Sequence, residues 1–120
     1  MNLLAMKRSM EQIDSPLITV VTVVFNDVQH IEETILSVVN QTYPNIEYIL
    51  IDGASKDKTV EIIKQYESGI ASWISEPDKG LYDAMNKGLK RATGDYVWFL
   101  NAGDTLYTAD TVQRIVASLK

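Results

Sequence analysis

The segment 98–104 reads Trp-Phe-Leu-Asn-Ala-Gly-Asp, so large apolar residues give way abruptly to small and polar ones. This pattern is typical of a buried strand that surfaces at a crevice. Residues 48–51 behave in the same way before Asp52, and residues 18–25 do so before Asn26. In an open parallel sheet such strand ends lie along one edge, where nucleotide-type ligands bind. The sequence therefore predicts both a sheet and the place of its site.

Strands and helices alternate along the rest of the chain. Residues 17–25 are apolar and β-branched at both parities, as in a strand covered on both faces, and residues 28–41 carry apolar side chains at helical spacing. This alternation predicts an α/β domain with a mostly parallel sheet flanked by helices and right-handed crossovers. The expected order is strand 17–25, helix 28–41, strand 47–51, a helix between Ser55 and Ser68, strand 70–75, helix 81–92, strand 96–100 and a helix from near Asp110.

Composition limits the class of protein. The 120 residues suffice for one domain, and 46% hydrophobic with 22% charged residues is a globular balance. The formal net charge of -5, with scattered Lys and Arg, argues against nucleic acid as a partner. The absence of cysteine excludes disulfide scaffolds, thiolate nucleophiles and zinc–sulfur sites, and it fits a reducing cytosol.

The first 15 residues are expected to differ from the rest of the chain. Residues 1–15 are predicted to be a flexible leader and residues 16–120 the domain. The leader places Lys7 and Arg8 after its apolar part, the opposite order to a secretory signal. No apolar run approaches the roughly 20 residues that span a bilayer. The expected location is the cytoplasm. A peripheral position at the inner face of the membrane is the alternative within this expectation.

Two carboxylates at strand ends leave alternatives open. Asp52, beside Gly53 and Ala54, either accepts hydrogen bonds from a ribose hydroxyl or a base N–H, or caps the next turn. Asp104 either holds a hard divalent cation, which prefers oxygen ligands, or is a turn residue. Lys87 either lines the same cleft or lies on a solvated helix face.

Five blocks in order then resemble family 2 inverting glycosyltransferases of the GT-A fold. Together they cover most of the chain between Leu17 and Asp104, at compatible spacing. The resemblance implies a Rossmann-like nucleotide-binding half. The blocks are residues 22–26, 37–47, 51–59, 76–88 and 92–104.

The resemblance also implies site residues. A uridine-type sugar nucleotide is expected to lie across the strand ends, with Asp78 and Lys79 at the mouth of the site and Lys79 facing phosphate as a point charge. A UDP-sugar is expected in preference to a GDP-sugar. The implied nucleotide-binding residues are Val23, Val24, Phe25, Asn26, Asp52, Asp78, Lys79 and Asn101.

The implied metal site departs from the family pattern. In the family, an Asp-x-Asp or Asp-x-Asp-Asp motif after the fourth strand holds Mn²⁺ or Mg²⁺ on the diphosphate. Here Asn101 and Gly103 stand where the family usually has Asp, which leaves Asp104 as the implied metal ligand. Asn101 still offers a neutral carbonyl oxygen to the cation or a donor to a sugar hydroxyl.

The implied function is transfer of a sugar, with inversion, from a nucleoside diphosphate sugar to a carbohydrate or lipid-linked acceptor in bacterial surface polysaccharide synthesis. The general base of the family comes from its second half, so it is expected beyond Lys120, and the domain is expected to be truncated before the acceptor half. The catalytic residue therefore stays unknown. An exposed sheet edge would favour self-association.

Two other classes compete with this interpretation. One is a non-catalytic nucleotide-binding or interaction module, supported by the missing carboxylates at Asn101 and Gly103. The other is a receiver-like phosphoacceptor domain, in which Asn26 and Asp27 bind magnesium and Asp52 accepts the phosphoryl group. The receiver interpretation needs a lysine after a fifth strand and a hydroxyl residue after the fourth. The fourth strand instead ends in Asn-Ala-Gly-Asp, and no fifth strand is visible.

Overall fold

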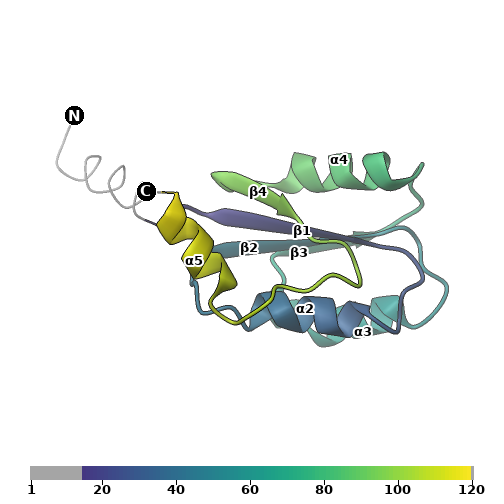
Figure 1. Ribbon diagram of the computed structural model, residues 1–120. Coiled ribbons are helices and arrows are strands. Elements are labelled where there is room, and N and C mark those ends of the chain that lie inside the picture. The colour runs from purple at the N-terminus through teal and green to yellow at the C-terminus, as the bar shows by residue number, and fades with distance from the viewer. Residues whose placement is uncertain (1–14, 120) are drawn as a thin grey trace.

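A four-stranded sheet with helices on both faces forms the part of the chain that the computed structural model describes, residues 15–119 (Figure 1). The predicted leader lies outside this range except for Ser15. The strands are β1 (Ile18–Val24), β2 (Ile46–Asp52), β3 (Ser72–Ser75) and β4 (Tyr96–Phe99). The helices are α2 (Ile31–Val39), α3 (Thr59–Gln65), α4 (Leu81–Arg91) and α5 (Thr111–Ser118), with a 3-10 helix η1 at Glu67–Gly69.

The strand order is β3-β2-β1-β4, and all neighbours pair in parallel. The chain builds the sheet outward from β1 to β3 and then returns to add β4 on the other side of β1. The carboxyl ends of the neighbouring strands β1 and β4 therefore mark the topological switch point of the sheet. Ligands bind such sheets just beyond these strand ends. This architecture confirms the predicted α/β class with a parallel sheet.

Helices cover the sheet on its two faces (Figure 1). Helix α4 lies on one face, where Ala84 packs with Val21, Val23, Ile49 and Ile51. Helices α2 and α3 lie on the other face, over a larger core that also takes Val112 and Val116 of α5. All seven residues of β1 are buried, as its continuous run of β-branched residues predicts.

Glycine explains how α4 approaches the sheet. Gly88, which weakens the helical pattern in the sequence, faces Val21 so closely that a Cβ at position 88 would overlap the Val21 side chain. The residue that costs helix propensity therefore permits close packing of helix on strand.

Several elements begin later than the periodicity predicts, because polar residues form turns before them. Helix α2 begins at Ile31 rather than at residue 28, since the amide groups of His30 and Ile31 both donate to the carbonyl oxygen of Asp27. Helix α3 begins only at Thr59, because Asp57 accepts hydrogen bonds from the Thr59 amide and hydroxyl. The errors lie at element boundaries and not in element type.

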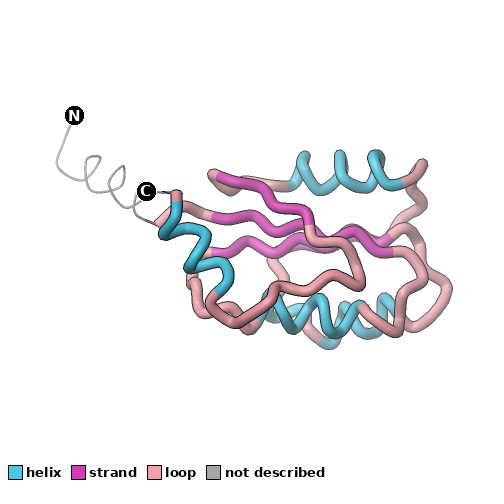
Figure 2. The backbone as a smooth tube through the Cα atoms, viewed as in Figure 1, coloured by secondary structure: helices cyan, strands magenta, loops and turns pink. Residues whose placement is uncertain are grey.

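The loop after β4 is long and passes close to α2 before it reaches α5 (Figure 2). Within the described range, no helix is both long and apolar enough to cross a membrane.

Candidate nucleotide-sugar site

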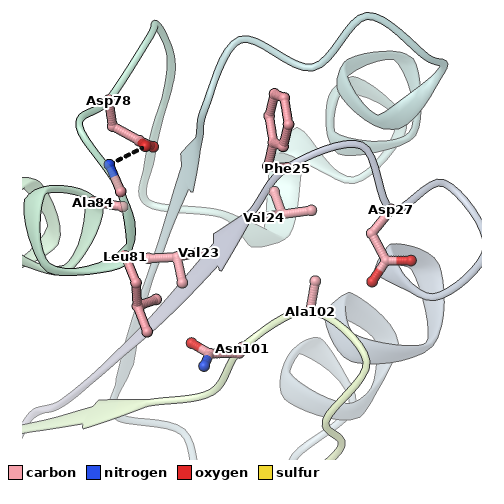
Figure 3. Close-up of a pocket in the computed structure, with 10 residues that line it drawn as sticks. Val23, Val24, Phe25, Asp27, Asp78, Leu81, Ala84, Asn101 and Ala102 are labelled. Carbon is pink, nitrogen blue, oxygen red and sulfur yellow. Dashed lines mark hydrogen bonds between the residues drawn. The ribbon is translucent and has the colours of Figure 1, made fainter.

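A pocket of about 400 Å³ opens at the switch point between β1 and β4 (Figure 3). This volume lies within the range of small-molecule sites. Its walls come from the end of β1, the loop before α4, the first turns of α4 and the residues after β4. The lining residues are Val23, Val24, Phe25, Asp27, Asp78, Gly80, Leu81, Ala84, Asn101 and Ala102.

Backbone hydrogen bonds continue the pairing of β4 with β1 beyond the regular strand. The amide of Leu100 donates to the carbonyl oxygen of Val21 at 2.9 Å, and that of Ala102 donates to Val23 at 3.2 Å. This extension carries Asn101 to the pocket, opposite the end of β1. The strand-end pattern of the sequence thus predicts where Asn101 lies.

Lys87 holds the loop that carries Asp78. The Lys87 ammonium donates to the carbonyl oxygen of Pro77 at 2.8 Å and lies 3.2 Å from a carboxylate oxygen of Glu76. Only 18% of the Lys87 side chain is exposed, so the expectation of a solvated helix face is wrong. Lys87 does not line the pocket either, and it acts on the site by positioning its wall.

Asp27 is a pocket residue that the sequence argument considered only for the receiver alternative. One of its carboxylate oxygens lies 2.7 Å from the Nδ1 atom of His30. Figure 3 shows its carboxylate at the side of the pocket away from Asp78. Its place directly after the first strand end, beside Asn26, is the sequence signal for this residue.

Asp52 is fully buried, and its carboxylate is occupied by protein donors. One carboxylate oxygen accepts hydrogen bonds from the Ser55 amide at 2.9 Å and from the Ser75 hydroxyl at 2.7 Å, and the other accepts one from the Ser55 hydroxyl. This geometry supports the turn-capping alternative for Asp52. Because Asp52 is fully buried, a ligand would reach its carboxylate only after the residues that cover it move.

Asn26 and Lys79 do not line the pocket. Asn26 has a φ of 48°, and its side-chain oxygen accepts a hydrogen bond from the Lys56 amide at 2.8 Å, so it joins the end of β1 to the loop after β2. The Lys79 side chain is exposed, while its backbone amide donates to Asp83 at 2.8 Å. Of the eight predicted nucleotide-binding residues, the pocket brings together Val23, Val24, Phe25, Asp78 and Asn101.

Three polar residues of the α2 region hold the loop that contains Asp104, and none of them is among the site residues predicted from the sequence. Thr34 donates its hydroxyl to the carbonyl oxygen of Asp104 and accepts from the Gly103 amide at 3.0 Å. The Ser37 hydroxyl accepts from Leu106, and Gln41 binds backbone groups of Thr108 and Val112. The sequence does carry a signal for these contacts. Positions 34, 37 and 41 are polar although they lie on the side of the helical pattern that otherwise carries apolar residues.

The charge of the pocket affects whether a divalent cation can bind there. Among the described residues that line it, Asp27 and Asp78 are acidic and none is basic. A diphosphate in this pocket would meet negative charge, which a divalent cation would offset. Asp104 is exposed and follows the lining residues by two positions, and the described residues contain no cluster of three acidic, histidine or cysteine side chains. One carboxylate with water and phosphate oxygens is nevertheless a set that Mg²⁺ accepts.

Comparison with known proteins agrees with the fold. The family model described as Glycosyl transferase family 2 matches residues 19–120. An uncharacterised glycosyltransferase of Mycobacterium tuberculosis is 43% identical over 106 residues, which are 88% of this chain and 40% of the relative. A PGL/p-HBAD biosynthesis glycosyltransferase of Mycobacterium bovis is 33% identical over 106 residues, 86% of this chain and 41% of the relative. The chain thus spans about 40% of the length of these relatives.

A solved structure extends the comparison to three dimensions. The mannosyltransferase PcManGT from Pyrobaculum calidifontis, in complex with GDP-Man and Mn²⁺, matches with a TM-score of 0.75 and 28% identity. The match covers 81% of this chain and 30% of the mannosyltransferase. The expected GT-A architecture is confirmed by such neighbours. The chain belongs to glycosyltransferase family 2.

Proposed function

We propose that residues 15–119 form the donor-binding part of an inverting glycosyltransferase that takes a sugar from a nucleoside diphosphate sugar. The observation that carries this proposal is the pocket at the switch point, because β1, α4 and the residues after β4 converge there. The bound GDP-Man of the similar mannosyltransferase supports a ligand of this class. The role of one relative in PGL/p-HBAD biosynthesis supports a surface glycan as the product, with a carbohydrate or lipid-linked acceptor.

In this proposal the nucleotide contacts Val23, Val24, Phe25, Asp78 and Asn101. The backbone at the end of β1 and the small residues Ala84 and Ala102 leave room for the ligand. Asn101 offers one amide donor and one carbonyl acceptor to the sugar or the phosphates. Asp52, Asn26 and Lys79 keep supporting roles through the turns that they organise or adjoin.

The proposed metal ligand is Asp104, with Mn²⁺ or Mg²⁺ completing its coordination on phosphate oxygens and water. When bound, the cation supplies positive charge to the leaving diphosphate. Thr34 orients the Asp104 backbone for this task. We assign only the donor side of the reaction to these residues, and the general base for the acceptor hydroxyl is not placed among them.

Self-association is proposed as a secondary property. Strand β4 pairs with β1 on one side and is an edge of the sheet within the described range. Tyr96 and Phe99 on this strand and Leu89 on α4 are exposed. Apolar side chains beside an open strand edge favour contact with another chain.

Titration calorimetry tests the donor-site proposal directly. UDP and GDP are titrated into the 120-residue chain with Mn²⁺ and with a chelator, and circular dichroism verifies folding. We expect one of the nucleotides to bind in a metal-dependent manner, and Asp104→Asn to weaken binding by about tenfold or more, the scale of a charge-assisted contact. Glu61→Gln, which removes the same charge from an exposed position on α3, is the matched control. A folded chain that binds neither nucleotide would contradict the proposal and favour the non-catalytic interaction module.

A further inference from the structure

The Asp27 carboxylate lies beside Gly103, which directly precedes the proposed metal ligand Asp104. A Cβ at position 103 would lie 3.9 Å from the Oδ2 atom of Asp27. Figure 3 shows the Asp27 carboxylate on the side of the pocket where Ala102 lies, away from Asp78. A carboxylate from the turn after β1 therefore faces the loop after β4, although the two segments are far apart in the sequence.

The turn at Gly103 explains why the carboxylate comes from elsewhere. Gly103 has a φ of 97°, a conformation that residues with a side chain rarely adopt. It is the third residue of a turn in which the Asp104 amide donates to the carbonyl oxygen of Asn101 at 2.9 Å. A positive φ at the third position of a turn favours glycine. The loop thus gains a tight turn at position 103 and carries no side-chain ligand there.

Helix α2 holds both partners of this contact. The carbonyl oxygen of Asp27 accepts two amide hydrogen bonds at the start of the helix, and the Asp27 amide donates to the Thr59 hydroxyl at 3.2 Å. Thr34, one turn further along α2, binds the backbone of Gly103 and Asp104. One helix therefore fixes the place of the Asp27 carboxylate relative to the loop after β4.

The two carboxylate oxygens of Asp27 have different surroundings. Oδ1 lies 2.7 Å from the Nδ1 atom of His30, and an ionised carboxylate only accepts, so Nδ1 carries the proton. For Oδ2 no donor is found among the described residues, and 29% of the side chain is exposed. Carboxylates that bind a metal are oriented by hydrogen bonds of this kind. An oriented carboxylate oxygen at the pocket wall also suits a hard divalent cation, which prefers oxygen ligands.

We propose that Asp27 is a second carboxylate ligand of the divalent cation in this pocket, in addition to Asp104. The inference rests on the proposed donor site. Asp27 supplies, from the turn after β1, the charge that the glycine at position 103 cannot supply. His30 is the positioning residue that orients the carboxylate. In the absence of a cation, the same carboxylate repels a diphosphate as a like charge.

The variant Asp27→Asn distinguishes a metal ligand from a residue that only shapes the pocket. The 120-residue chain, with folding verified by circular dichroism, is mixed with excess UDP or GDP, and bound Mn²⁺ is measured by electron paramagnetic resonance. We expect the Kd for Mn²⁺ to rise by about tenfold or more, since even residues behind metal ligands contribute about 10- to 100-fold. With a chelator in place of Mn²⁺, calorimetry should show the nucleotide bound at least as tightly as by the parent chain, because a like charge is removed.

The matched control is Glu33→Gln, which removes the same charge from an exposed position in the first turn of α2. Both affinities of this variant should equal those of the parent chain.

A pair of double variants moves the carboxylate to the facing position. In the Asp27→Asn background, Gly103→Asp restores a carboxylate near the original one, and Gly103→Asn imposes the same strain on the backbone without the charge. We expect the chain with Gly103→Asp to bind Mn²⁺ roughly threefold or more tightly than the chain with Gly103→Asn, the scale of coupling between groups in contact.

The outcomes distinguish this inference from the proposal beneath it. An unchanged Mn²⁺ affinity in Asp27→Asn, or a fall of the metal-free and metal-dependent affinities together, would overturn the role of Asp27 and leave the nucleotide pocket standing. Equal Mn²⁺ affinities of the two double variants would place the cation away from position 103 and overturn it as well. Failure of the folded parent chain to bind either nucleotide, with or without Mn²⁺, would overturn the donor site too.

Discussion

The hydroxyl of Thr34 donates a hydrogen bond of 2.8 Å to the backbone carbonyl of Asp104, 70 residues later in the chain. The same oxygen accepts a hydrogen bond of 3.0 Å from the Gly103 amide. Thr34 is fully buried, whereas Gly103 and Asp104 are exposed, so these bonds tie an exposed loop to the core side of α2. A helix on one face of the sheet thereby fixes the loop that carries the proposed metal ligand.

The substitution Thr34→Val should release this loop. The change keeps the shape of the side chain but leaves two backbone groups without their partner, at a cost of about 1–3 kcal/mol of unfolding free energy. We also expect the Mn²⁺-dependent part of nucleotide binding to weaken more than the metal-independent part, because Asp104 loses its orientation. Urea unfolding and calorimetry measure the two effects. Thr105→Val, at an exposed position in the same loop, is the control that should change neither.

Replacement of Asp52 should lower the stability of the fold without weakening nucleotide binding. Asp52→Asn removes one of the two carboxylate oxygens that accept hydrogen bonds from Ser55 and Ser75. The free energy of unfolding should therefore fall by about 1–3 kcal/mol. Nucleotide affinity, measured under conditions where the variant is fully folded, should stay close to that of the parent chain. A loss of affinity with unchanged stability would return Asp52 to the ligand-binding role that the family resemblance implies.

Glu47 should make stability depend on pH. Burial raises the pKa of its carboxyl, but hydrogen bonds from the Thr93 hydroxyl and amide and from the Thr19 hydroxyl outweigh burial and lower the pKa below its usual value. A lowered pKa in the folded state stabilises the fold fully above the ordinary pKa of a glutamate. That stabilisation is lost as the pH falls through the lowered value.

The variant Glu47→Gln isolates this effect. At pH 7 we expect it to lower the free energy of unfolding by about 1–3 kcal/mol, since it loses hydrogen bonds to a charged group. The difference from the parent chain should shrink as the pH falls below the ordinary pKa of glutamate. Urea unfolding at a series of pH values measures this. A difference that stays constant down to acid pH would show that charge plays no part.

Gly88 should resist replacement although it lies inside a helix. Gly88→Ala gains up to about 1 kcal/mol of helix propensity, but its methyl group would overlap Val21. Overpacking of this kind costs about 1–3 kcal/mol, so the net effect should be destabilising. Asn86→Ala on the exposed side of the same helix should not destabilise. The double variant Gly88→Ala with Val21→Ala should recover part of the loss, and additive effects in this cycle would refute the contact.

The fold was predictable because its strands are continuous apolar runs with polar ends. Such runs, separated by helical periodicity, indicate a parallel sheet, and the strand ends locate Val23, Val24 and Asn101 at one edge. Local sequence does not show which distant backbone groups a side chain will meet. For that reason Thr34 and Lys87, whose partners lie in other segments, were missed or placed incorrectly.

Asp52 and Asp78 illustrate the same limit at the site. Both are carboxylates near strand ends, and nothing in the local sequence separates their roles. The fold buries the first among serine donors and brings the second over Gly53 at the pocket wall. The missing Cβ at position 53 is visible in the sequence, but its consequence depends on a loop 25 residues away.

The most direct test of the donor site is an amide NMR titration of the isotopically labelled chain with the nucleotide that binds, in the presence of Mg²⁺. We expect shift changes to concentrate at residues 23–27, 78–84 and 101–104, which lie around the pocket between β1 and β4. Replacement of Mg²⁺ by paramagnetic Mn²⁺ should then broaden the signals of residues 101–104 most strongly. The structure has a second, smaller pocket, which Tyr43, Pro44 and Tyr48 help to line. Shift changes centred on that pocket instead, or a folded spectrum that no nucleotide alters, would contradict the donor-site proposal.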